Sequence, residues 1–191
     1  MSFSSRVKEE LSYQTGSAMH CRIAEIAAIL SMCGQIFQEE DGKVSIKIQT
    51  ENLAVARKYF TLLKKTYNID VDICIRSHIH TGKSRTYILE VTDDYAARKI
   101  LSSVKFMNGD GEIEEDYAIV HSMVLRKACC KRAFLRGLFL CAGSISEPEK
   151  TYHFEIVCGT PERAQQICDM MKTFNIDGKC ITRKKYHVVY I

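Results

Sequence analysis

Nine cysteines and six histidines give this chain its clearest capacity for metal or redox chemistry. Zinc sites usually show paired ligands a few residues apart, and no Cys-x-x-Cys pair occurs here. Cys129 and Cys130 are adjacent and cannot readily bridge each other, while Lys131 and Arg132 beside them could lower the thiol pKa and make them redox-sensitive. A helix start with partly buried, reduced thiols is the favoured interpretation, and a zinc site the less favoured one.

His78 and His80 lie two residues apart, on one face of a predicted strand, and could in principle hold a metal. A third ligand at useful spacing is missing, which favours histidines on a binding surface. The sequence also contains no P-loop, no Gly-x-Gly-x-x-Gly after a strand and no Gly-x-Ser-x-Gly. It therefore predicts no cofactor and no metal, and indicates none of these enzyme classes.

Two segments, 73–89 and 178–191, are basic and contain no acidic residue. Both read as hairpins, and both suit contacts with phosphate groups. A third candidate is the strand KVSIKIQ, whose period of two turns its polar residues to the face opposite its valine and isoleucines. The predicted DNA-contacting residues are Lys43, Lys47, Gln49, Arg76, His78, Lys83, Arg85, Arg183, Lys184 and Lys185.

The electrostatic case is moderate, because the net charge is only +4 and the pI about 8.5. Glu155 occupies the position in the second half that Lys47 occupies in the first, and the acidic run 112–116 opposes DNA as well. A charge run is often only a solvated surface. DNA binding is thus favoured narrowly over a role without it.

These residues must be positioned by two copies of one unit. At an offset of 109, CRIAEIAAILSMCG (21–34) aligns with CKRAFLRGLFLCAG (130–143), so that Gly34 falls on Gly143, and both glycines are expected to end a helix. Small residues recur four apart in both copies, and such a stripe lets two helices approach closely. The predicted interface between the repeats is formed by Ala24, Ala28, Ala133 and Gly137.

Each copy continues as a strand pair, a helix and a second strand pair, and the first copy adds a third helix. In the second copy, Thr160 and Pro161 mark a helix start. The expected organisation is an N-terminal helical segment (1–18), repeat one (19–107), a linker (108–127) and a truncated repeat two (128–191). We expect the chain to be the N-terminal part of a longer protein.

Two αββαββα repeats with paired small-residue helices resemble the LAGLIDADG homing endonucleases. The nine-letter motif corresponds to IAAILSMCG (26–34) and LRGLFLCAG (135–143). Segments such as SFSSRVKEEL, TENLAVAR, CCKRAFLRGLFLCAGSISEPEKTYHFEIV and RKKYHVVYI are similar to the WhiA family, regulators of sporulation and cell division in Gram-positive bacteria. The resemblance covers essentially the whole chain. It implies an α+β fold whose two sheets form a saddle on DNA, and a C-terminal helix-turn-helix domain beyond this chain.

Cleavage by the endonuclease fold needs an acid at the eighth motif position of each helix, to hold divalent metal ions. Those positions are Cys33 and Ala142 here. Alanine offers no ligand, and a thiol is a poor ligand for Mg²⁺. The resemblance therefore implies a catalytically inactive domain.

The resemblance implies a cytoplasmic, nucleoid-associated transcriptional regulator of sporulation, cell division and chromosome segregation that contacts double-stranded DNA. We expect no membrane segment, and a monomer with an internal pseudo-dimer. The alternative is a scaffold that binds a regulatory protein, with DNA affinity supplied mainly by the helix-turn-helix domain. An enzyme with an unfamiliar site is the least favoured class.

Overall fold

The computed structural model describes residues 2–77, 85–114 and 119–191. Its elements follow the predicted order twice. After α1 (Phe3–Tyr13), the first repeat comprises α2 (Met19–Cys33), β1 (Gly34–Gln38), β2 (Val44–Thr50), α3 (Leu53–Tyr67), β3 (Asp72–Ser77), β4 (Arg85–Val91) and α4 (Asp94–Val104). The second comprises α5 (Ala128–Ala142), β5 (Gly143–Ile145), β6 (Phe154–Cys158), α6 (Pro161–Lys172), β7 (Lys179–Arg183) and β8 (Tyr186–Tyr190).

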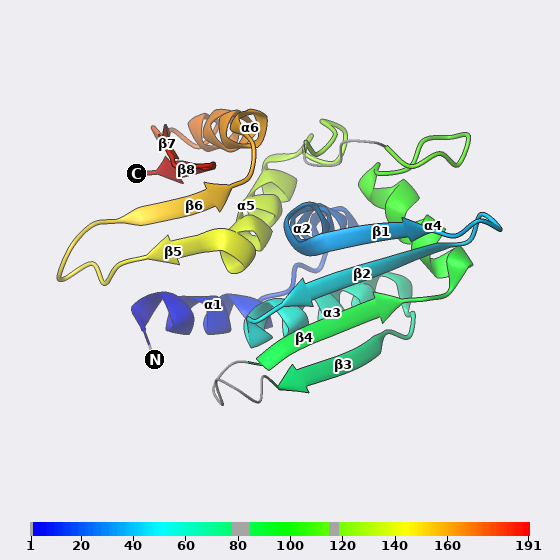
Figure 1. The fold of residues 1–191 in the computed structure, drawn as a ribbon. Helices are drawn as coiled ribbons and strands as arrows, with labels where there is room; N and C mark the ends of the chain where they lie inside the picture. Colours follow the sequence, from blue (N-terminus) through cyan, green and yellow to red (C-terminus); the bar gives the residue numbers. More distant parts are fainter. Residues whose placement is uncertain (1, 78–84, 115–118) are drawn as a thin grey trace.

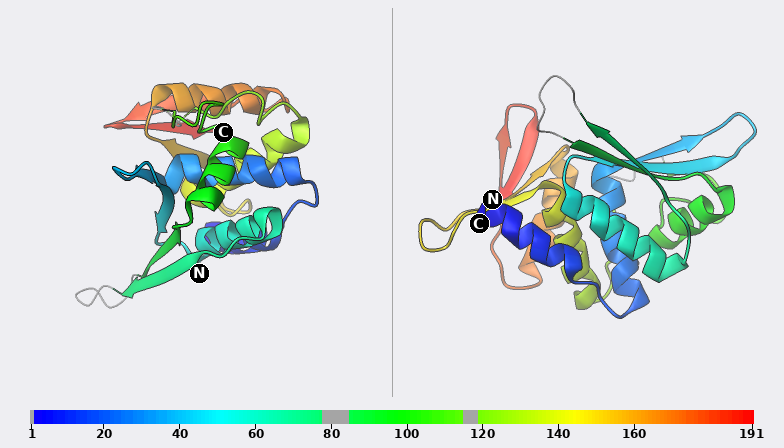
Figure 2. Two further views of the ribbon diagram at one scale, coloured as in Figure 1. Left: turned by 90° about the vertical axis from the view of Figure 1, so that its right-hand side faces the viewer. Right: turned by 90° about the horizontal axis from the view of Figure 1, so that it is seen from below.

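The two antiparallel sheets have the same topology, β1-β2-β4-β3 in one repeat and β5-β6-β8-β7 in the other. They lie on either side of the central helix pair α2 and α5 (Figure 1). Further views show the strands gathered along one side of the molecule and most of the helices along the other (Figure 2). The predicted α+β architecture of two repeats, each with its own four-stranded sheet, is confirmed.

Strand alternation determines which face of each sheet meets the helices. In β2, Val44, Ile46 and Ile48 are at most 1% exposed and join the core, whereas the residues between them are not buried. Helix α6 buries Ala164 and Ile167 in the core of the second repeat. It begins as predicted, because the Thr160 hydroxyl accepts a hydrogen bond from the backbone N–H of Arg163 and Pro161 occupies the first turn.

The central contact runs between α2 and α5. Ala24 and Ala28 are fully buried and Ala133 is 2% exposed. A Cβ atom built onto Gly137 would lie only 2.7 Å from the Cβ of Ala28 and 3.0 Å from the backbone oxygen of Glu25. Real side chains avoid such distances, so glycine is what permits the two helices to approach this closely.

Gly34 and Gly143 end these helices for a different reason from the expected one. Their φ angles of −80° and −85° are extended, not left-handed, and each glycine is at once the cap of its helix and the first residue of a strand. An added Cβ would collide with the backbone oxygen of Leu30 or with the ring of Phe139. Lack of a side chain, rather than backbone freedom, is the requirement here.

A buried ionic network, unforeseen from the sequence, fixes α2 to its neighbours. Glu25 is fully buried, and its carboxylate accepts two 2.8 Å hydrogen bonds from Arg136 of α5 and pairs at 3.0 Å with Nζ of Lys58 from α3. Lys58 also donates to the backbone oxygens of Leu11 and Gln14, at the end of α1. Through Glu25 and Lys58, the network thus connects the four helices α1, α2, α3 and α5.

None of the helices in the described part of the chain is long and apolar enough to cross a membrane.

Candidate nucleic-acid interface

The saddle face is defined here as the face of each sheet that is turned away from the core helices. In the first sheet, Lys47 is paired with Glu90 and Gln49 with Ile88, so these four share that face with Ser45. Strand β3 is paired with β4 through Arg76 and Thr86, which places Arg76 on the same face at the outer edge of the sheet. Arg76 and Gln49 are exposed.

The second sheet repeats this arrangement. Glu155 of β6 is paired with Tyr190 of β8, and Arg183 of β7 with Tyr186. The shared strand order aligns β3 with β7, and in that alignment Arg183 corresponds to Arg76. Both repeats therefore carry an exposed arginine at the same position of the outermost strand, on the saddle face.

Acidic partners neutralise part of this face. Lys47 pairs with Glu90 at 2.9 Å, and the Arg183 guanidinium lies 3.5 Å from Glu155. In the β1–β2 turn, the Lys43 ammonium lies 2.7 Å from Asp41, and hydrogen bonds from Lys43 hold the pKa of Asp41 below its usual value. The positive potential of the saddle face is correspondingly weaker than a count of its lysines and arginines suggests.

The remaining predicted contacts fall at hairpin tips. Lys184 and Lys185 form the two-residue turn between β7 and β8; Lys184 has a φ of 56°, and the Lys185 ammonium lies 5.6 Å from the centre of the Tyr186 ring. Arg85 is paired with Ser77, the residue that follows Arg76 in β3. Because side chains alternate along a strand, Arg85 and Ser77 point to the face of the hairpin opposite Arg76. His78, His80 and Lys83 lie outside the described residues.

The two positions that would carry catalytic acids are the last residues of α2 and α5, Cys33 and Ala142. Cys33 is hydrogen-bonded to the thiol of Cys141, which lowers the pKa of Cys33; the same bond, together with burial, raises the pKa of Cys141. The charges that act on these thiols come from Lys8 and Arg163, both cationic. Burial lowers the pKa of Lys8. Thiols and neighbouring cations suit Mg²⁺ poorly, because Mg²⁺ prefers oxygen ligands such as carboxylates.

Within the described ranges, only one group of three or more potential ligands lies close together, and it is at the opposite ends of the same helices. It consists of His20 and Cys21 in the first turn of α2 and Cys129 and Cys130 in the first turn of α5. No disulfide forms among the nine cysteines, and three of them, Cys74, Cys129 and Cys180, are exposed.

Two family models match the chain: the WhiA N-terminal LAGLIDADG-like domain over residues 19–107 and the WhiA LAGLIDADG-like domain over residues 131–191. The chain belongs to the WhiA family. The "Probable cell division protein WhiA" of Lachnoclostridium phytofermentans is 49% identical over the whole chain, and that of Desulforamulus reducens is 38% identical. This WhiA-family chain spans 61% and 59% of the length of these two relatives.

Solved structures agree with the fold. The N-terminal LAGLIDADG domain of DUF199/WhiA matches with a TM-score of 0.70 and 22% identity, covering 100% of this chain and 83% of that one. The homing endonuclease I-DmoI, solved in complex with DNA and manganese, matches with a TM-score of 0.60 and 12% identity, covering 91% of this chain and 90% of that one. At these identities the likeness shows the fold alone.

Two features of the site escaped the sequence analysis. Glu25 stands in an ordinary amphipathic helix pattern, so nothing in its neighbourhood indicated a fully buried carboxylate. The second feature is the group of His20, Cys21, Cys129 and Cys130. It was not recognised because these residues form two adjacent pairs and lack the spacing of zinc motifs. The offset of 109 would have found it, since it aligns His20 with Cys129 and Cys21 with Cys130.

Proposed function

We propose that this chain is a DNA-contacting, non-cleaving domain of a transcriptional regulator of cell division and sporulation. The observation that carries the proposal is the matched pair of exposed arginines, Arg76 and Arg183, at equivalent positions on the saddle face. A groove-facing sheet with positive groups at two symmetric positions suits two phosphate tracks of one duplex. Relatives named as cell division proteins and a fold shared with a DNA-bound endonuclease support it.

The proposed contacts come from three parts of the face. The strand β2 supplies Lys47 and Gln49, the outer strands supply the two arginines, and the tip of the second hairpin supplies Lys184 and Lys185. Each phosphate contact releases counterions and adds about 0.9 to the magnitude of the slope of log affinity against log salt. The neutralising partners Glu90 and Glu155 make modest affinity the expected outcome.

The absence of cleavage is proposed on the chemistry of the motif positions. Cys33 and Ala142 provide no oxygen ligand at the helix ends. The positive charges of Lys8 and Arg163 would also repel a divalent metal ion there. The domain would then use the endonuclease fold for binding without bond breaking, as a cytoplasmic, nucleoid-associated monomer whose pseudo-dimer is internal.

The test is duplex-DNA binding by this chain at two salt concentrations with Mg²⁺ present, followed by electrophoresis of the DNA. Salt-sensitive binding with intact DNA is expected. Changing Arg183, Lys184 and Lys185 together to Ala should lower the magnitude of the salt slope by up to about 2.7, since each of the three side chains would account for about 0.9.

The matched control removes three exposed lysines from the helix side, by changing Lys65, Lys99 and Lys172 to Ala. It alters the net charge equally and should leave the slope unchanged. Equal effects of the two triple variants would contradict a contact through the saddle face, and Mg²⁺-dependent cutting would contradict the proposed loss of catalysis.

A scaffold function is the second candidate, favoured by an uncovered apolar edge. Ile73 and Ile75 of β3 are 53% and 56% exposed, on the face of the hairpin opposite Arg76. Exposed isoleucines on an edge strand suit a protein partner. Changing both to Ser in the full-length protein should abolish regulation without changing DNA affinity if this function is correct, and should change neither if it is not.

A further inference from the structure

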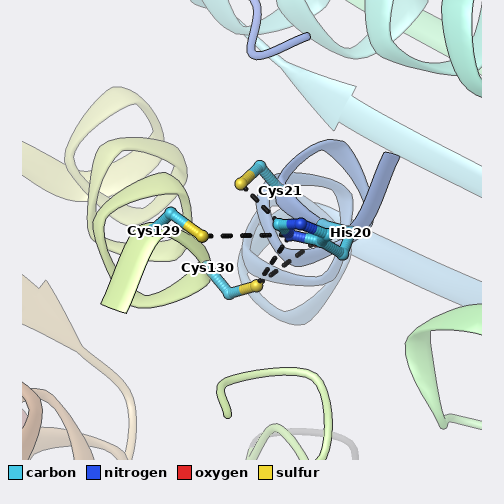
Figure 3. A group of neighbouring side chains, drawn as sticks. All are labelled: His20, Cys21, Cys129 and Cys130. Carbon is cyan, nitrogen blue, oxygen red and sulfur yellow. Dashed lines mark hydrogen bonds between the residues drawn. The ribbon is translucent and has the colours of Figure 1, made fainter. Parts of the chain in front are cut away.

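The N-terminal ends of α2 and α5 meet at a cluster of three thiols and an imidazole. The Nδ1 atom of His20 lies 3.3 Å from Sγ of Cys21, 3.3 Å from Sγ of Cys130 and 3.9 Å from Sγ of Cys129. All four potential ligand atoms lie within 4.8 Å of one another. Figure 3 shows the imidazole facing the three sulfur atoms, two of which come from the other helix.

The cluster follows from the pseudo-twofold symmetry of the fold. His20 and Cys21 are the second and third residues of α2, and Cys129 and Cys130 are the second and third residues of α5. Because the two helices cross as symmetric partners, equivalent positions near their starts are brought face to face. Neither helix start has a side-chain cap, and the positive end of each helix dipole favours anionic sulfur nearby.

The sulfur–nitrogen separations match a single tetrahedral ion. With Zn–S of about 2.3 Å and Zn–N of about 2.0–2.1 Å, a tetrahedron has edges of about 3.8 Å between sulfurs and about 3.6 Å between sulfur and nitrogen. The observed S–N separations of 3.3–3.9 Å bracket the second value. An iron–sulfur cluster places several irons between its ligands and would need the sulfurs farther apart.

The donor set selects the kind of metal. Three thiolates and one imidazole form the Cys₃His set of structural zinc sites, and they are unsuited to Mg²⁺ or Ca²⁺, which take oxygen ligands. A zinc ion bound by three thiolates and an imidazole carries a net charge of −1. This charge is stabilised by the positive ends of the two helix dipoles and by Lys127 and Lys131, which lie nearby in the sequence.

We propose that His20, Cys21, Cys129 and Cys130 together bind one Zn²⁺ ion that joins the starts of the two central helices. Four protein ligands complete the tetrahedron and leave no position for water or substrate, so the site is structural rather than catalytic. Binding releases the protons of the thiols and links two segments that are separated by more than a hundred residues. The site lies at the helix ends opposite Cys33 and Ala142 and does not depend on DNA binding.

The experiment uses the chain purified without a histidine tag, under reducing conditions, with metal content measured by mass spectrometry of the elements and of the native protein. About one zinc ion per chain is expected. Replacement by Co²⁺ should give the sulfur-to-metal charge-transfer bands and visible bands of a tetrahedral thiolate site. In competition with a chelator, Cys129→Ser and Cys21→Ser should each weaken zinc binding by on the order of 100-fold or more.

The matched controls are Cys74→Ser and Cys180→Ser, which remove exposed thiols on β3 and β7. Both should retain the ion and its cobalt spectrum. Because Cys21 is only 9% exposed, a change there also disturbs packing; His20→Asn at an exposed position provides a second test, and circular dichroism checks the fold of each variant. Chelation should lower the melting temperature of the unaltered chain and leave that of Cys129→Ser unchanged.

Three results would overturn the proposal. One is a reduced chain that binds no zinc when zinc is supplied. Another is zinc binding that Cys129→Ser and Cys74→Ser weaken equally. The third is a disulfide among the cluster cysteines in freshly prepared protein, with zinc unable to bind after its reduction; the cluster would then be a redox pair.

Discussion

Gly137 shows how one missing methyl group controls the central contact. In an ordinary helix, Gly→Ala would stabilise by about 1 kcal/mol. Here the new Cβ would lie 2.7 Å from the Cβ of Ala28 and 3.0 Å from the backbone oxygen of Glu25. Relieving these contacts would require the helix backbone to shift, which costs free energy. We expect Gly137→Ala to lower the free energy of unfolding by about 1–2 kcal/mol, because overpacking outweighs helix propensity.

The control for this prediction is the double variant Ala28→Gly with Gly137→Ala, which moves the methyl group from one helix to the other. Chemical denaturation of both single variants and the double variant should yield a favourable coupling energy of about 1 kcal/mol. Additive effects would show that the two helices do not touch at this point.

At the same scale, sequence reasoning was strongest where a residue type has few alternatives. Small residues four apart and glycines at aligned positions marked the two helices, because their spacing is itself the geometric signal. Charges carry no such signal: Glu25 and Lys58 look like solvent-exposed helix residues, and only the packing of α1 and α5 over them makes them buried. Their burial could be found only from the structure.

At the scale of elements, we expect the loss of the buried acid Glu25 to destabilise the fold far more than the loss of an exposed acid. Changing Glu25 to Ala leaves the buried Lys58 ammonium without its counter-charge and should cost about 3–5 kcal/mol of unfolding free energy. The comparison is Asp169→Ala, which breaks the exposed 3.8 Å pair with Lys172 and should cost less than about 1 kcal/mol. Similar losses from both variants, measured by denaturant titration, would argue against an energetically important network.

The order of elements was predictable because each repeat supported the other. A strand period in KVSIKI had an aligned strand in TYHFEI, and the hairpins that follow were confirmed as β3–β4 and β7–β8. The boundaries of the predicted domains remain predictions. The direction of Arg85 could not be predicted from the sequence, because the face on which a hairpin residue lies depends on a register that only strand pairing fixes.

For the whole molecule, we predict that mutating the acids of the saddle face strengthens DNA binding. Removing the negative charges of Glu90 and Glu155 would free Lys47 and Arg183 for phosphate groups. If the domain binds DNA through this face, Glu90→Gln with Glu155→Gln should tighten binding by about tenfold and steepen its salt dependence by about 0.9–1.8, for one or two new phosphate contacts.

The isosteric amide keeps the shape of each side chain, so a change in affinity reports charge. A paired control, Glu10→Gln with Glu162→Gln, removes two exposed acids from α1 and α6 and should have little effect. Filter binding or fluorescence anisotropy would distinguish them. Unchanged affinity of the saddle-face variant would favour the scaffold function.

The sequence predicted the symmetry of the whole molecule but not what the symmetry brings together. Ligands separated by 109 positions are distant along the chain, and they meet only because α2 and α5 cross with their starts in contact. Adjacent residues in a first helical turn also lack the spacing by which metal motifs are recognised. In other duplicated folds, aligning the two repeats and comparing their cysteines and histidines position by position would identify such sites.

The direct passage from helix to strand at Gly34 and Gly143 has a mechanical consequence. With no flexible linker between α2 and β1 or between α5 and β5, each sheet moves as a rigid extension of its helix. The two fifteen-residue helices are roughly 22 Å long. We therefore expect any change in the crossing angle of α2 and α5 to change the distance between the two sheets as well.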